Sequence, residues 1–188
     1  MKKLVFLSAV LTMFTTMAVS AQVSGKLVSS KTQIKFFSST PAEDIQAVNL
    51  TSVSTINRET GEVVFSVPMQ GFEFEKALMQ KHFNGEDFLN TQTYPKAKLT
   101  GKITNLDKID FTKDGTYTAT LEGEMTIKET TKAVKENGTV TVKGDLVEVQ
   151  SKFNLTLADF GITFVKGKPS TNIAKAVEVS VLSQYLAE

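Results

Sequence analysis

The chain has 188 residues, no cysteine, one histidine and a formal net charge of +1. The lack of cysteine excludes disulfides, thiol nucleophiles, thiolate metal sites and covalent c-type haem. The charge is close to balanced and becomes −1 without Lys2 and Lys3, so we expect no partnership with nucleic acid or with an anionic membrane surface.

The first 21 residues have the pattern of a signal peptide. Lys2 and Lys3 precede an uncharged, mostly apolar run, and Val19-Ser20-Ala21 places small residues where a signal peptidase cleaves. The run is shorter than the roughly 20 apolar residues of a membrane span. We therefore expect cleavage before Gln22, a periplasmic or secreted location, and one domain over residues 22–188 that does not stably insert into a membrane.

Alternation of apolar and polar residues with period two predicts β-strands through most of residues 22–188. In chain order, strands are expected around residues 34–37, 50–56, 63–69, 97–103, 117–128, 139–142, 147–157 and 177–185. Glu136-Asn137-Gly138 resembles a tight hairpin turn. Only residues 71–93 break the pattern, and their spacing predicts a short helical insert near residues 74–92.

Long strands that are apolar on one face must wrap that face around a common interior, either as a two-sheet sandwich or as a closed barrel. Runs of ten or more residues suit tilted barrel strands better. We therefore predict an all-β fold, an antiparallel barrel of about eight strands. The interior of such a barrel is either filled by side chains or holds one small ligand, and the pattern leaves both open.

The inward faces are rich in phenylalanine and methionine, because the chain has 13 phenylalanines, six methionines and no tryptophan. Any one of these side chains is best explained as core packing. Together, around an unfilled interior, they would line an apolar pocket whose methionines adapt to the shape of a ligand. The candidate ligand-binding residues of this lumen are Phe36, Phe65, Val67, Met69, Leu121, Met125, Phe153, Leu155, Phe160 and Phe164.

Catalytic and metal-binding signals are weak. His82 is the only histidine and the one candidate for a general base or metal ligand, because histidine commonly takes these roles. A single histidine without cysteine does not make a typical transition-metal site, and a helix-end residue bonded to backbone explains it more simply. The sequence has no Gly-x-Ser-x-Gly elbow and no glycine-rich phosphate loop. We expect no enzyme activity, metal or cofactor.

Several segments together resemble the YceI-like family of exported, lipocalin-like barrels associated with polyisoprenoids and other lipids. They are Lys31–Ser39, Ala42–Ala47, Thr60–Phe65, Phe72–Phe74, Leu78–Asn84, Phe88-Leu89, Tyr94–Ala97 and Gly101–Ile103. Many members carry His-Gly-Val-Thr-Lys after the central strand, whereas this chain has Lys128-Glu129-Thr130-Thr131-Lys132.

The resemblance implies a lipocalin-like barrel that holds an isoprenoid, a quinone or another long-chain lipid in its lumen, as a carrier or reservoir. The alternative is a filled barrel that acts as a protein-interaction or stress-response module without a small ligand. The volume of the lumen discriminates between these hypotheses, because close packing would leave no room for a ligand. The sequence is compatible with a homodimer.

Overall fold

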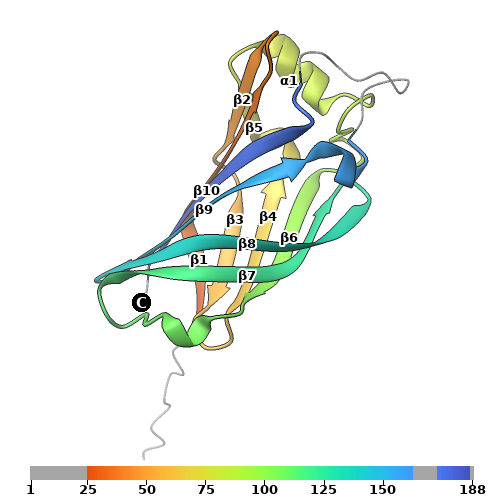
Figure 1. The fold of residues 1–188 in the computed structure, drawn as a ribbon. Helices are drawn as coiled ribbons and strands as arrows, with labels where there is room; N and C mark the ends of the chain where they lie inside the picture. Colours follow the sequence, from red (N-terminus) through yellow and green to blue (C-terminus); the bar gives the residue numbers. More distant parts are fainter. Residues whose placement is uncertain (1–24, 163–172, 187–188) are drawn as a thin grey trace, which may run out of the picture.

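The computed structural model describes residues 25–162 and 173–186, which form ten β-strands and one α-helix (Figure 1). The expected signal peptide and Phe164 lie outside these ranges. The elements are β1 Lys26–Ser39, β2 Asp44–Asn49, β3 Val53–Asn57, β4 Glu62–Pro68, β5 Phe72–Phe74, α1 Ala77–Asn84, β6 Lys96–Ile103, β7 Gly115–Ile127, β8 Thr130–Lys143, β9 Leu146–Thr156 and β10 Ala176–Leu186. No helix in these ranges is long and apolar enough to span a bilayer.

The strands form one antiparallel sheet that closes on itself as an eight-stranded barrel. The ring runs β1, β3, β4, β6, β7, β8, β9 and β10, and the pairing of β10 with β1 closes it. The wall beside β1 is made of two strands in succession, β3 and then β2, with a break between them. In the next position of the wall, β4 pairs with β3 and β5 pairs with β2. β1 pairs with β3 near its start and with β2 near its end. The predicted all-β barrel is confirmed.

Asn49 organises the break between β2 and β3. Its fully buried side chain accepts hydrogen bonds from the Thr51 amide and the Ser52 hydroxyl, both at 2.9 Å. The Asn49 amide group donates to the Pro68 carbonyl at 2.7 Å, which links this bend to the end of β4. The break therefore keeps its polar groups paired inside the wall, as buried amides require.

The helical insert is present but shorter than predicted. α1 covers Ala77–Asn84, and β5 and turns occupy the flanks of residues 71–93. Gln80 fixes α1 to β5, because its amide nitrogen donates to the Phe72 carbonyl at 2.7 Å while its oxygen accepts from the Phe74 amide at 3.2 Å. In Figure 1, α1 lies at one end of the barrel, at the far end of β1 from Lys26.

The predicted hairpin turn at residues 136–138 is wrong. These residues lie inside β8, where Gly138 pairs with Ala119 of β7 and Ser151 of β9. A β-carbon on Gly138 would come within 2.5 Å of the Gln150 carbonyl oxygen, so the glycine serves close approach of strands. The turn between β7 and β8 is Lys128-Glu129, with Lys128 at a φ of 54°.

Candidate functional site

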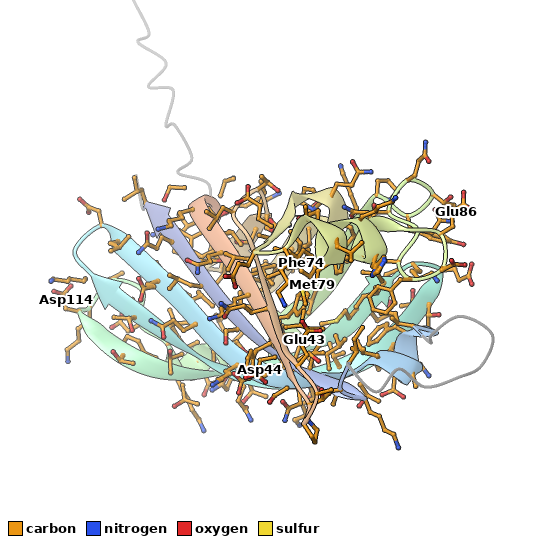
Figure 2. The ribbon with its side chains drawn as sticks, turned by 90° about the horizontal axis from the view of Figure 1, so that it is seen from above. Glu43, Asp44, Phe74, Met79, Glu86 and Asp114 are labelled. Carbon is orange, nitrogen blue, oxygen red and sulfur yellow. The ribbon has the colours of Figure 1, made fainter. Side chains whose placement is uncertain are left out.

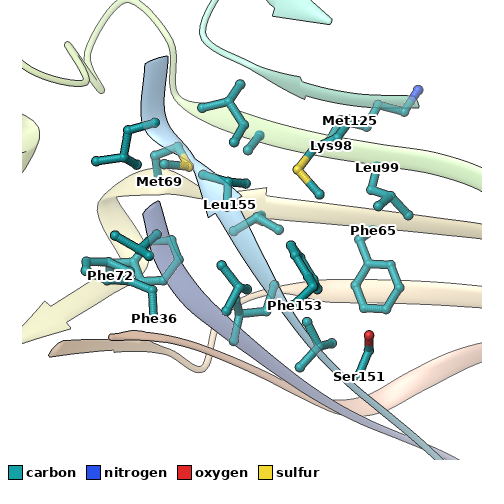
Figure 3. Close-up of a pocket in the computed structure, with 18 of the residues that line it drawn as sticks. Phe36, Phe65, Met69, Phe72, Lys98, Leu99, Met125, Ser151, Phe153 and Leu155 are labelled. Carbon is teal, nitrogen blue, oxygen red and sulfur yellow. The ribbon is translucent and has the colours of Figure 1, made fainter. Parts of the chain in front are cut away.

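The barrel encloses a cavity of about 790 Å³ (Figure 3). This volume falls within the range of about 300–1,000 Å³ typical of small-ligand pockets. Inward-facing side chains from almost every wall strand line it, and most of them are aliphatic or aromatic. The interior is therefore hollow, although the same inward faces also form the hydrophobic core.

Eight of the ten predicted lumen residues line this cavity. They are Phe36, Phe65, Val67, Met69, Leu121, Met125, Phe153 and Leu155. Figure 3 labels Phe36, Phe65, Met69, Met125, Phe153 and Leu155 among them. Phe160 is a correction: it is buried in the core but does not line the cavity, whereas Leu157 at the start of the same 3₁₀ turn after β9 does. Phe164 lies outside the described residues. Contact of any of these side chains with a ligand stays a prediction.

Sequence reasoning missed the aromatic residues that β5 and α1 bring to the lumen. Phe83 packs parallel to Phe36, with ring centroids 5.8 Å apart, and lies 4.9 Å from Phe74 and 5.5 Å from Phe72. Phe88 extends this cluster from the following loop. Phe74 of β5 and Met79 of α1, both labelled in Figure 2, line the cavity as well. Met79 and Phe83 are one helical turn apart, and this spacing is the signal that would have placed them on one apolar face.

Four hydroxyl groups form a buried cluster farther from α1 along β1. Ser54 lies 2.7 Å from the Tyr185 hydroxyl, 3.0 Å from Thr32 and 3.2 Å from Ser183, and Ser183 donates to Thr32 at 3.1 Å. All four side chains are at most 1% exposed. Burial raises the pKa of Tyr185, and the hydrogen bonds with Ser54 and Ser183 oppose that shift. Each hydroxyl of the cluster has a hydrogen-bond partner within it, so burying these polar groups costs little.

One group of polar residues in the cavity lining lies at the α1 end. It includes Glu43, Lys81, His82 and Asp87, and Glu43 is paired with Lys76 at 2.7 Å. His82 is exposed, and its carbonyl accepts the Gly85 amide at the end of α1. Within the described ranges, no three histidine, cysteine, aspartate or glutamate residues are placed to hold a metal ion.

Lys128 and Glu129, where the chain departs from the expected family pattern, fasten the β7–β8 turn to the loop after α1. The Lys128 ammonium donates to the Phe88 carbonyl at 3.1 Å and lies 5.7 Å from the centre of the Tyr94 ring. Tyr94 donates to the Glu129 carboxylate at 2.6 Å, and this hydrogen bond is the main cause that raises the pKa of Tyr94. Lys128 and Glu129 thus attach the β7–β8 turn to the segment between α1 and β6, at the α1 end of the cavity.

The sequence profile of the YceI-like domain matches residues 7–184. The chain belongs to the YceI-like family. No curated protein sequence matches it.

Solved structures share the YceI-like fold at low sequence identity. BcnA from Burkholderia cenocepacia matches with a TM-score of 0.67 and 14% identity, over 81% of this chain and 95% of that one. A polyisoprenoid binding domain from Saccharophagus degradans matches with a TM-score of 0.73 and 12% identity, over 88% and 99%. A YceI protein from Campylobacter jejuni matches with a TM-score of 0.56 and 11% identity, over 73% and 81%.

Proposed function

We propose that this YceI-like protein binds an apolar long-chain ligand in its barrel lumen, such as an isoprenoid, a quinone or another lipid, and acts as a carrier or reservoir. The observation that carries the proposal is the cavity of about 790 Å³ lined mainly by apolar side chains. A filled barrel acting as an interaction module would have close packing in this place. The hollow interior therefore favours ligand binding over that alternative.

The shape and chemistry of the lumen support binding rather than catalysis. The aromatic cluster around Phe83 offers contact surface at the α1 end of the lumen, and Tyr185 lines the cavity farther along the barrel. Neither presents a nucleophile with an adjacent base, which covalent catalysis requires. The polyisoprenoid binding domain of Saccharophagus degradans shares the fold, which adds support for an isoprenoid-like ligand.

The energetics of an apolar chain explain why a carrier suits this lumen. Each methylene buried from water gains about 0.8 kcal/mol, so a long chain would bind very tightly if water were the only competitor. A membrane buries the same chain, however, and is the competitor that matters after export. A lumen that roughly balances the membrane accepts and releases its ligand. Lumen length and polar groups near the openings then select the ligand.

The proposal is tested by purifying the protein without detergent from the exported fraction of its native cells, followed by organic extraction and mass spectrometry. We expect one prenyl or acyl species at a stoichiometry near one per chain. Loading of the purified protein with a prenyl quinone serves as the second arm. A protein that is empty after purification and takes up no quinone would contradict ligand binding and favour a protein partner.

A further inference from the structure

Strands β8 and β9 separate along half of their length. Their pairing runs from Lys143 and Leu146 to Gly138 and Ser151 and stops there. Beyond that point, residues 130–137 of β8 pair with β7 alone and residues 152–156 of β9 pair with β10 alone, among the described residues. Figure 1 shows the two strands diverging from this fork.

The cavity reaches the slot between the separated strands. Its lining includes Glu136, Asn137 and Gly138 from β8 and Ser151 and Phe153 from β9. The Ser151 hydroxyl donates to the Asn137 carbonyl at 2.8 Å, so a side chain takes the place of the next rung of the ladder. The 3₁₀ turn after β9 packs against β8 and bounds the slot at its other end.

Glu136 faces the lumen at this slot. It pairs directly with Leu121 of β7, and directly opposed residues of antiparallel strands point to the same face of the sheet. Leu121 lines the cavity, and Glu136 lines it too. In contrast, Lys135 and Lys152 on the outer face are paired with Glu122 and Glu178.

The Glu136 carboxylate has no hydrogen-bond or ion-pair partner among the described residues. Burial raises its pKa, because the lumen solvates the negative charge less well than water does. Lys132 lies on the same face of β8, opposite Met125, but it is exposed and does not line the cavity. A partly desolvated carboxylate therefore faces the lumen with its acceptor capacity free.

We infer that Glu136 receives the polar head group of the ligand at the β8–β9 slot, and that this head group is a hydrogen-bond donor, either a hydroxyl or an ammonium. The inference rests on the proposed function and names its ligand class. An ionised carboxylate only accepts hydrogen bonds. It therefore binds a donor and repels a phosphate or carboxylate head, and it does so more strongly in the lumen than in water.

The test uses three probes with one common chain: geranylgeranylamine, geranylgeraniol and geranylgeranyl monophosphate. Dissociation constants are measured by native mass spectrometry and calorimetry for the wild type, E136Q and E124Q. Each probe is kept below its critical micelle concentration. Glu124 is the matched control, because it is an exposed carboxylate on the outer face of the neighbouring strand β7. Circular dichroism verifies that both variants fold.

We expect the wild type and E124Q to prefer the amine and the alcohol over the monophosphate by about tenfold or more, as for one charge-assisted hydrogen bond. In E136Q, that ratio falls to about threefold or less. Equal binding of all three probes by the wild type, or the same ratio in E136Q, would overturn the inference and leave the proposed function standing. If no probe binds the wild type, the proposed function fails and this inference with it.

Discussion

The buried side chains at the two ends of the lumen are held by different interactions. Near Tyr185, four buried hydroxyls satisfy one another, so polar atoms are held at fixed distances. Near α1, the rings around Phe83 pack by shape alone, without directed bonds. Directed bonds resist displacement, whereas apolar packing can rearrange around a guest. The comparison assigns rigidity to the hydroxyl end and adaptability to the α1 end.

The largest effect is expected at the hydroxyl end. Tyr185→Ala removes a fully buried aromatic ring and leaves Ser54 without its shortest contact, so the free energy of unfolding should fall by about 3–5 kcal/mol. Tyr185→Phe keeps the ring and should cost only about 1 kcal/mol. Urea denaturation measures both. Equal losses for the two variants would show that the hydrogen bonds, and not the packed ring, dominate this end.

A smaller loss is expected at the α1 end. Phe83→Ala removes the ring that contacts Phe36, Phe72 and Phe74, and should cost about 3 kcal/mol, because the neighbours can collapse into the space. Hydrogen exchange should accelerate in α1 and β5 and stay unchanged around Tyr185. Leu78→Ala is the control, since Leu78 is 63% exposed on the same helix and should change stability by less than about 0.5 kcal/mol. Faster hydrogen exchange throughout the barrel in Phe83→Ala would contradict the claim that the two ends of the lumen are stabilised independently.

The smallest effect concerns Glu136, whose pKa is raised by burial. The folded state favours the protonated form, so the contribution of Glu136 to stability should be highest at acidic pH and decline as pH rises through its folded-state pKa. E136Q lacks this decline. Its Tm should equal that of the wild type near pH 4 and exceed it by no more than a few degrees at pH 7. A lower Tm for E136Q at pH 7 would show that the carboxylate has a stabilising partner.

The inner faces of β7 and β9 were predictable because alternation with period two is a local property. Leu121, Met125, Phe153 and Leu155 all line the cavity as the pattern indicated. Leu121 marks the inner face of β7 without any knowledge of the strands beside it. The order of the strands around the barrel did not matter for that prediction.

The features that sequence reasoning missed depend on contacts between distant segments. Gly138 suggested a turn, but the close approach of β9 requires the glycine inside a strand. The break between β2 and β3 depends on the hydrogen bond that the Asn49 side chain donates to the Pro68 carbonyl at the end of β4. The hollow interior is also non-local, because it depends on how far apart opposite walls stand. Periodicity in one strand carries no information about these distances.

The central claim, an apolar ligand inside the lumen, is tested most directly by filling the lumen. Val181 of β10 lines the cavity between Ile34 and Ser151, so Val181→Trp occupies the space and adds the only tryptophan of the chain. Thr139→Trp, at an exposed position on the outer face of β8, is the matched control. Circular dichroism verifies the fold of both variants.

Titration with the fluorescent apolar probe N-phenyl-1-naphthylamine gives the measurement. The wild type and Thr139→Trp should bind it saturably at one site, with a blue-shifted emission that reports an apolar surrounding. Val181→Trp should bind it about tenfold more weakly or not at all, since the added ring excludes the probe from the lumen. Undiminished binding by a folded Val181→Trp protein would place the probe outside the lumen and contradict the account.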